Sequence, residues 1–505
     1  NYNFDHTDYQ TVYGYDVNKD PYIIANQTSS VTEYAYKSNF FNPNIFTEYS
    51  KSLESGHNFK VMLGFQSELF KQRDITASQD GIMSGVATLN TTQTNAQNRG
   101  GYSEWATAGF FGRLNYDYKG RYLAEVNMRY DGTSRFLRDN RWNLFPSFSL
   151  GWNIAREAFF EDFTDLISTL KIRGSWGELG NQNTDNWYPF YRTIDINKNQ
   201  WGNYALGSWL VNGVKPNISK ESALVSSLLT WEKTQTLDLG FDLSMLNNRL
   251  NVTFDYFQRK SKDMVGPAPE LPNLLGIDVP KVNNLDMTSK GWEIQVNWRD
   301  QIRDFKSLSD NQVVIDKYPN PSNTILDKDN NNTYYAGAHV GDIWGFQTIG
   351  IAKTDQEMKD HLASMPNGAQ DVLGSGWGAG DVMYADLNGD GQISRGNKTL
   401  ADHGDLKKIG NSTPRYNFGL NLDAAWKGFD LKLFFQGTMK RDYMPDSGST
   451  MFWGAVGYWQ TNFFKQHLDY FRGESTTNPL GPNLGGYYPR PLEDGRNRNP
   501  QTRYL

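Results

Sequence analysis

The stretch from Arg415 to Gly437 constrains the fold more than any other part of the chain. Over residues 416–426 most apolar side chains share one parity and most polar side chains take the other. The same alternation resumes over 429–436, after Lys427-Gly428. Because successive side chains of a strand point to opposite faces, this pattern predicts a β-hairpin with one apolar and one polar face. Such a hairpin suits a wall with lipid on one side and water on the other.

The alternation recurs along most of the chain. It predicts further strands at about 31–51, 59–66, 110–118, 121–130, 148–154, 170–176, 237–243, 250–256, 292–298 and 304–314, the last with the fewest alternating residues. Short connections at Ser55-Gly56, Lys119-Gly120, 157–168, Asn247-Asn248, 300–303 and Lys427-Gly428 alternate with long ones at 74–101, 181–229, 263–287, 318–411 and 440–505. Outer-membrane barrels have short periplasmic turns and longer extracellular loops, so we predict that the short set faces the periplasm.

Composition narrows the class of protein. The 505 residues exceed the usual limit of about 250–300 for one soluble core, whereas a barrel grows by adding hairpins. The mean hydropathy is −0.66, and no run of about 18 apolar residues occurs, which excludes a helical membrane protein. A net charge of −6 gives no basic surface for nucleic acid, and the absence of cysteine excludes a disulfide framework. We therefore predict an all-β protein, a transmembrane antiparallel β-barrel.

A soluble β-propeller is the main alternative fold. It would show a repeat of about 40–50 residues with recurring blade signatures, and we find none. Aromatic residues also gather at the expected strand ends, such as Tyr116 and Tyr118 beside one turn and Trp426 beside another. Aromatic girdles at the two membrane interfaces explain these positions, which favours the barrel.

Both ends of the sequence are typical of a fragment. Residue 1 is Asn within strand-like sequence, no signal peptide is visible, and residue 505 falls in a loop-like segment. The tally of expected strands is about 13, whereas bacterial barrels usually have an even number and must close. We expect the chain to be part of a larger barrel protein.

Several blocks of sequence resemble one known family. The blocks are Phe111–Tyr118 with Arg121–Leu123, Arg129–Phe136, Phe145–Trp152, Gly174–Gln182, and Ile409–Tyr416 with Phe434–Gly437. In this order they resemble the TonB-linked outer-membrane proteins of the SusC/RagA family. The resemblance implies that residues 1–505 are a partial TonB-dependent receptor β-barrel domain, with 318–411 as a long extracellular loop region. The signal, the TonB box, the plug and the last strands would lie outside it.

The resemblance also implies partners and a location. The family barrel has 22 strands, holds an N-terminal plug, and is energised by the TonB complex through an N-terminal region that this chain lacks. A SusD-like lipoprotein covers its extracellular loops, and SusC–SusD pairs can dimerise. The pair imports oligosaccharides or peptides across the outer membrane of Gram-negative bacteria of the Bacteroidota type.

A possible cation loop lies at residues 386–402. Asp386, Asn388 and Asp390 occupy positions 1, 3 and 5 of a calcium-loop pattern, and Gln392 offers a backbone carbonyl. Position 12 is an Asn where an EF-hand needs Glu, and Asp402 is a candidate late carboxylate. The pattern indicates either a bound Ca²⁺ or an Asx turn that only shapes the loop.

Aromatic residues in the long loops are candidates for contact with substrate or partner. The candidates are Trp187, Trp201, Trp209, Trp377, Trp453 and Trp459. Flat rings stack on sugars or anchor a partner protein. The alternative is that each ring packs a folded loop, since a long loop needs a core of its own.

No catalytic motif is visible, because the six histidines lack metal-ligand spacing and the nucleophile-elbow and zinc-protease patterns are missing. We therefore expect a protein that is not an enzyme. Three hypotheses stay open: a TonB-dependent importer of oligosaccharides or peptides, a passive outer-membrane pore or surface adhesin, and a soluble secreted glycan enzyme or lectin. Upstream sequence separates the first two, and extraction without detergent would favour the third.

Overall fold

The computed structural model describes most of the chain. The described residues are 2–7, 12–15, 21–25, 29–84, 86, 88–184, 186–192, 195–197, 218–220, 224–226, 229–266, 280–299, 302–318, 334–443, 465–474 and 479–490. They fall into two compact units. The first unit comprises residues 1–119, 124–148 and 178–231, and the second comprises 120–123, 149–177 and 232–505.

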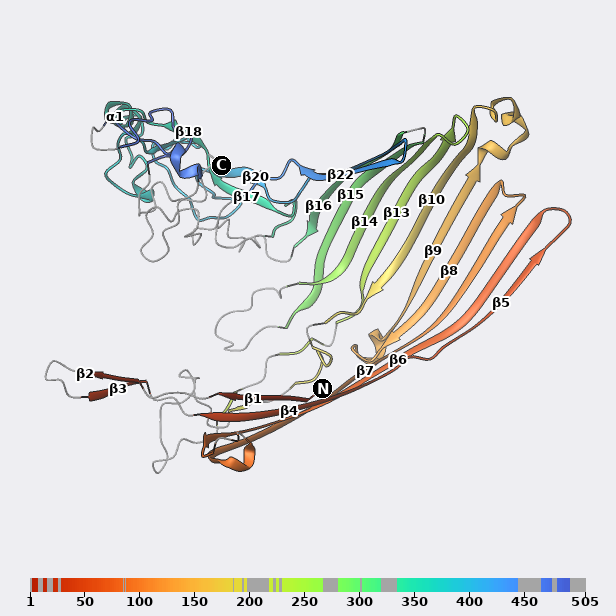
Figure 1. Ribbon diagram of the computed structural model, residues 1–505, viewed down its shortest axis with the longest axis horizontal. Helices are drawn as coiled ribbons and strands as arrows, with labels where there is room; N and C mark the ends of the chain where they lie inside the picture. The colour runs from red at the N-terminus through yellow and green to blue at the C-terminus, as the bar shows by residue number, and fades with distance from the viewer. Residues whose placement is uncertain are drawn as a thin grey trace. The chain divides into compact units, whose positions relative to one another are not determined.

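One antiparallel sheet of 14 strands dominates the described residues (Figure 1). The strands are β1 (Tyr2–Thr7), β4 (Ser30–Phe41), β5 (Asn44–Ser52), β6 (His57–Ile82), β7 (Thr92–Tyr118), β8 (Tyr122–Thr133), β9 (Trp142–Asn153), β10 (Ile167–Asn181), β13 (Glu232–Met245), β14 (Leu250–Gly266), β15 (Val282–Arg299), β16 (Ile302–Lys317), β21 (Tyr416–Trp426) and β22 (Phe429–Met439). Their hydrogen-bonding order follows the chain, with β4 and β5 both pairing with β6. A sheet of sequential neighbours is the wall of an up-and-down barrel.

The remaining elements lie in the connections. They are the strand pairs β2 (Val12–Tyr15) with β3 (Pro21–Ala25), β11 (Asp195–Asn197) with β12 (Ile218–Lys220), β17 (Asp342–Phe346) with β20 (Leu406–Asn411) and β18 (Thr348–Ile351) with β19 (Val382–Tyr384), the helix α1 (Asp355–Ala363), and 3₁₀ helices at Leu89–Thr91, Arg138–Asn140, Ile154–Arg156, Ala158–Phe163, Asp371–Leu373 and Lys465–Asp469. Among the described residues, no helix is long and apolar enough to cross a membrane.

The strands of the second unit, such as β10, β13 and β14, have one apolar and one polar face, as the alternation predicts. In the second unit Leu239 is 50% exposed and Ile172 is 48% exposed, while their neighbours Asp238 and Arg173 point to the opposite face. A soluble fold would bury such leucines and isoleucines against a second layer. The exposed apolar face is therefore the face of a wall that meets lipid.

The predicted tight turns are confirmed by the backbone. Lys119-Gly120 and Lys427-Gly428 both have positive φ at their two central residues, and so does Asn247-Asn248. This conformation matches the right-handed twist of the flanking strands. Because paired strands alternate in direction, within the second unit Asn247-Asn248 and Lys427-Gly428 lie at the strand ends opposite Lys317 of β16 and Tyr416 of β21.

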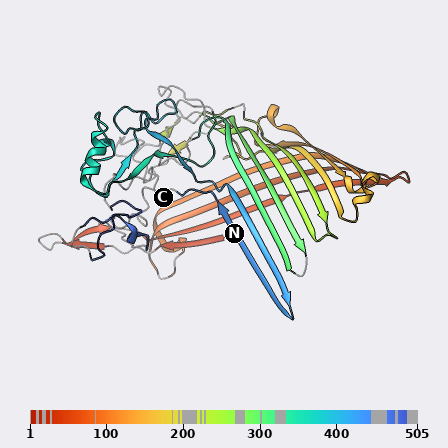
Figure 2. The ribbon, with the colours of Figure 1, turned by 90° about the horizontal axis from the view of Figure 1, so that it is seen from above.

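Strand β16 is also confirmed. It pairs with β15 from Arg303↔Arg299 onward and with β21 from Ile302↔Ala424 to Asp310↔Tyr416. The hairpin β21–β22 then follows with no register shift and projects beside β16 in Figure 2.

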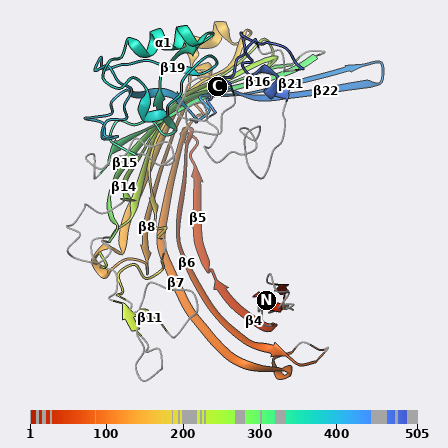
Figure 3. The same ribbon diagram turned by 90° about the vertical axis from the view of Figure 1, so that its left-hand side faces the viewer.

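Two predicted boundaries in the first unit are wrong. Residues 74–101 are not a loop, because β6 runs to Ile82 and pairs with β7 as far as Ile82↔Thr92 (Figure 3). The segment lacks alternation because both of its faces are polar, yet the backbone ladder continues. The strand expected at 31–51 is broken at Asn42-Pro43, where proline cannot donate to the ladder.

The predicted loop 263–287 is shorter than expected. β14 extends to Gly266 and β15 begins at Val282, and residues 267–279 lie outside the described part of the chain. Residues 264–266 pair with 282–285 across β-bulges, a pairing that the polar sequence does not reveal.

The long segment 318–411 contains a folded region rather than an open loop, and we call residues 334–411 the loop head. Its core is a cluster of buried side chains: Ile315 from β16, and Tyr335, Ala338, Phe346, Met365, Leu373, Val382, Tyr384, Ile393 and Leu406. Helix α1 begins after Thr354, whose side chain accepts a hydrogen bond from the Glu357 amide. The loop head thus has its own hydrophobic core at one end of β16 and β21.

Candidate functional site

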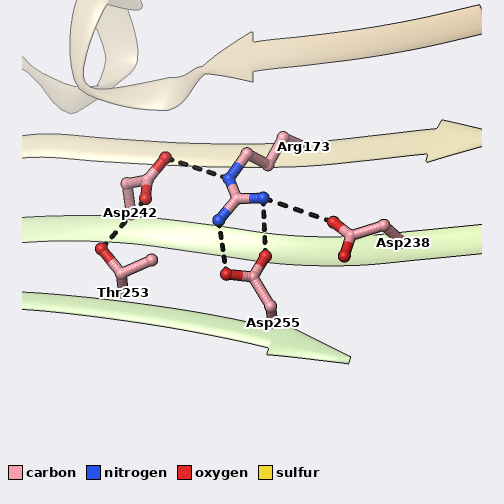
Figure 4. Close-up of polar contacts among 5 residues, drawn as sticks. All are labelled: Arg173, Asp238, Asp242, Thr253 and Asp255. Atoms are coloured by element: carbon pink, nitrogen blue, oxygen red, sulfur yellow. Dashed lines mark hydrogen bonds and ion pairs between the residues drawn. The ribbon is translucent and has the colours of Figure 1, made fainter. Parts of the chain in front are cut away.

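The polar face of the second unit is organised around Arg173 of β10 (Figure 4). Its guanidinium lies 2.6 and 2.8 Å from the two oxygens of Asp255 on β14, and 3.3 Å from Asp238 and from Asp242 on β13. Thr253 donates a hydrogen bond of 3.2 Å to the free oxygen of Asp242. One cation therefore ties three neighbouring strands together.

Gly240 makes this arrangement possible. A Cβ at residue 240 would lie 2.3 Å from the Asp255 Oδ1 atom and 3.0 Å from the Arg173 Cζ atom. Only glycine leaves room for the guanidinium between β13 and β14. The three carboxylates exceed the single guanidinium in charge, and all four side chains are 21–34% exposed, so this face suits contact with water.

A similar polar network lies on the first unit. Arg129 binds Asp131 through two hydrogen bonds of 3.0 Å, and Gly109 leaves the space that the Asp131 carboxylate fills. Nearby on β7 and β8, Arg113 donates to Asn127 at 2.6 Å. The polar face therefore carries paired charges and amides in both units.

The connection from β8 to β9 begins with a rigid corner at residues 133–136. The Ser134 amide donates to the Ala106 carbonyl, and the Ser134 hydroxyl accepts from the Ala106 amide, both at 2.9 Å. The Thr133 hydroxyl accepts a hydrogen bond from the Arg135 amide, and Phe136 is fully buried against Trp231. These contacts hold the backbone of the corner at Arg135.

An aromatic group lies beside this corner, on the otherwise polar face of β4, β6 and β7. We define it as Phe40, Phe70, Trp105 and Trp187. Phe70 is 6.4 Å from Phe40, 6.1 Å from Trp105 and 5.6 Å from Trp187, between ring centroids. Trp187 is held in place because the next residue, Tyr188, bonds through its hydroxyl to the amide and the carbonyl of Glu104.

The family-like block 409–416 attaches the loop head to the sheet. The Asn411 side chain donates to the Val340 carbonyl and to Asp342, and accepts from the Thr413 amide. Gly341 adopts a φ of +89°, and a Cβ there would meet the Thr413 hydroxyl at 2.3 Å. An open cavity of about 210 Å³ lies beside this attachment, lined by residues that include Val313, His339 and Lys440.

A buried ion pair joins the segment 465–490 to the loop head. Arg490 binds both carboxylate oxygens of Asp381 at 2.5 and 2.6 Å, and Asp381 is 0% exposed. Phe471 packs where Gly380 has no side chain. Burial, together with Tyr488, raises the pKa of Tyr470 to about 12, which reflects a closely packed segment. Two connections far apart in sequence therefore form one folded body.

The predicted cation loop forms the turns expected of its sequence. Asp386 accepts hydrogen bonds from the amides of Gly389 and Gly391, and Asp390 accepts one from the Gln392 amide. Asn388 accepts one from the Asp390 amide.

Asp402 instead bonds to Asn397, and the fully buried Asp405 accepts the amides of Leu387, Asn388 and Ser394. Within the described residues no three His, Cys, Asp or Glu side chains converge on a metal position. Calcium binding stays a prediction, with oxygens of Asp386, Asn388 and Asp390, the Gln392 carbonyl and Asp402 as its candidate donors.

The predicted loop aromatics fall into three groups. Trp187 belongs to the aromatic group described above. Trp377 is partly buried against the loop-head core and donates to the Gly374 carbonyl at 3.0 Å, which is the packing alternative. Contact of either ring with substrate or partner stays a prediction. The other candidates lie outside the described residues: Trp201, Trp209, Trp453 and Trp459.

Sequence reasoning missed the roles of Arg135, Asp381 and Arg490. Arg135 lies within a block that resembles the family, yet nothing in that block marks it as a buried cation. The pairing of Asp381 with Arg490 joins residues 109 positions apart, and only the fold brings them together.

The fold and its faces define a class: an outer-membrane β-barrel wall with lipid on one side and a polar path on the other. The profile of the family "TonB dependent receptor-like, beta-barrel" matches residues 1–464. The chain belongs to this family. The family consists of receptors rather than enzymes, which confirms the expectation that the protein is not an enzyme.

Two curated relatives place the chain within the family. It is 28% identical over 431 residues to TonB-dependent receptor P3 of Formosa agariphila, covering 81% of this chain and 39% of that protein. It is also 28% identical over 427 residues to TonB-dependent receptor SusC of Bacteroides thetaiotaomicron, covering 83% of this chain and 39% of that protein. The chain spans about two fifths of the length of these relatives.

Solved structures agree on the fold. The RagAB peptide importer in its "closed-closed" state has a TM-score of 0.67 at 18% identity, covering 91% of this chain and 47% of that one. The RagAB peptide transporter has a TM-score of 0.63 at 19% identity, covering 82% of this chain and 42% of that chain. The resemblance to the SusC/RagA family, the β-barrel fold and the outer-membrane location are thus confirmed.

Proposed function

We propose that this chain is the wall of a TonB-dependent importer that takes up oligosaccharides or peptides together with a SusD-like surface lipoprotein. The observation that carries the proposal is the polar face, where Arg173 and three carboxylates on β13 and β14 line what would be the inside of the barrel. A wall that only anchored a surface adhesin would not need paired charges along its inner strands.

The loop head supports the partner half of this proposal. It is a packed body that the Asn411 contacts fasten to the ends of β16 and β21. The ion pair of Asp381 and Arg490 joins a second connection to it. A pre-formed surface of this kind would dock a lid protein without a large ordering cost.

The test uses the full-length protein in its native outer membrane. We expect an affinity-tagged protein to co-purify with a SusD-like lipoprotein, and uptake of its labelled oligosaccharide to cease in cells that lack TonB. Isolation as a lone barrel, with uptake unchanged by TonB loss, would instead support the passive pore. A neighbouring porin serves as the control, because its transport must not depend on TonB.

A further inference from the structure

Arg135 is a buried cation without a counter-charge in the described part of the chain. The residue is 8% exposed, and its Nε atom has no hydrogen-bond partner. Its guanidinium forms no ion pair among the described residues. The guanidinium instead lies over an aromatic ring, with its Cζ atom 5.3 Å from the centroid of Trp105. Burial lowers the pKa of Arg135.

Burying an isolated ion carries a large desolvation free energy, and stacking on one ring offsets only part of it. The acidic group closest to it in sequence, Asp131, is already bound by Arg129 through both of its oxygens. Hydrogen bonds hold Ser134 beside Ala106, and in this conformation the Arg135 side chain is buried away from water. The energetics therefore point to a negative group that arrives from outside these residues.

The surroundings of Arg135 indicate the chemistry of that group. The aromatic group stands on the polar face of β4, β6 and β7, where the register otherwise places side chains such as Gln72 and Glu68. Phe40 is 56% exposed, so the aromatic group offers open ring surface. Rings next to a guanidinium fit a flat ligand unit that carries a carboxylate.

The position suits an incoming ligand. Arg135 lies in the connection 134–141, and Trp187 lies in the connection after β10. Within the first unit, both connections lie at the strand ends opposite the short turn Ser55-Gly56, which is the side that we predict to be extracellular. A solute entering from outside would meet this corner before it reached the strands below.

We propose that Arg135 and the aromatic group form a binding site for an acidic oligosaccharide, in which Arg135 binds the carboxylate of a hexuronate unit and the rings stack on its sugar faces. The Gln72 amide, on the same face, favours hydroxyl-bearing units over an apolar peptide. This site would be a specificity element of the importer proposed above, and so it rests on that function. Binding to the purified protein tests it separately from uptake.

The experiment measures binding of trigalacturonate and of its neutral methyl ester to the purified full-length protein by calorimetry. We expect the wild type to prefer the acid by at least tenfold, and Arg135→Gln to bind the acid no better than the ester. Arg135→Lys keeps the charge but loses the two-pronged geometry, so we expect an intermediate loss. Arg138→Gln is the matched control, because this exposed arginine lies three residues away in the same connection.

Three results would overturn the proposal. The wild type would bind acid and ester equally if the counter-charge of Arg135 comes from elsewhere in the full-length protein. Arg135→Gln would retain the preference for the acid over the ester if another group binds the carboxylate. An Arg135-dependent preference for a tripeptide with a free carboxylate over trigalacturonate would assign the site to peptides. Because the acid–ester comparison needs only the wild type, failure of a variant to fold leaves the proposal testable.

Discussion

The ion pair between Arg490 and Asp381 should control whether the segment 465–490 stays on the loop head. We consider Arg490→Met, which keeps most of the side-chain stem and removes the charge. Asp381 would then remain at 0% exposure without the guanidinium, while the hydrogen bond from the Gly378 amide at 2.8 Å would persist. Loss of one partner of a buried pair costs about 3–5 kcal/mol, and Arg490 is 34% exposed, so water reduces the cost to about 2–3 kcal/mol.

Hydrogen exchange of the full-length protein measures this cost directly. The amide of residue 490 bonds to the Gly380 carbonyl of the loop head, so it reports on the docking of the segment. A loss of about 2–3 kcal/mol corresponds to exchange roughly 30 to 140 times faster. In the double variant Arg490→Met with Asp381→Asn, the loss of protection should be smaller than the sum of the losses in the two single variants. The reason is that no unpaired buried charge remains.

Lys60→Met provides the control, since Lys60 pairs with Glu48 on exposed strands, where such pairs contribute about 0–1 kcal/mol. It should leave exchange in the segment unchanged. If Arg490→Met also leaves the amide of residue 490 protected as in the wild type, the ion pair does not hold the two connections together.

Three further predictions concern the sheet and the loop head. Gly240→Ala should destabilise the barrel by about 1–3 kcal/mol, because the new methyl group would overlap Asp255, and heat-modifiability on gels measures it; Gly174→Ala, which meets only a leucine methyl group at 3.1 Å, should have a smaller effect, and equal effects would contradict the geometry. Burial lowers the pKa of His361 from its usual 6.5, so the unfolded loop head binds the proton more readily and its stability should fall as the pH drops below about 6.5. His361→Gln should remove this pH dependence in hydrogen exchange of α1, and an unchanged pH profile would exclude His361 as the cause. Calcium should raise the melting temperature of the wild type but not of Asp386→Asn, and a melting temperature insensitive to chelator would reject the cation site.

The sequence predicted the sheet where one face must be apolar. Around Leu239 and around the hairpin at Lys427-Gly428, alternation and turn chemistry specify strand, register and face together. The prediction fails where neither face of a strand meets lipid, because no face then has to be apolar. Residues 74–101 pair as strands, yet both faces are polar there, so the pattern that identifies a strand is absent.

The candidate site was predictable only in part. Trp187 was singled out as a loop aromatic. Its neighbours Phe70 and Trp105 lie just beyond the strands predicted at 59–66 and 110–118, and only the strand register brings the three rings together. Arg135 could not be identified from sequence, because burial without a partner is a property of the fold. The same holds for Asp381, whose partner comes from a distant connection.

The central claim is that one face of these strands meets lipid and the other meets water. The chain contains no cysteine, so single-cysteine variants report on one position each. Gln295 and Ile294 are neighbours on β15 and point to opposite faces. In full-length protein in outer membranes, we predict that a membrane-impermeant thiol reagent labels Gln295→Cys and that Ile294→Cys stays unlabelled until detergent is added. Equal labelling of the two variants in intact membranes would contradict the account.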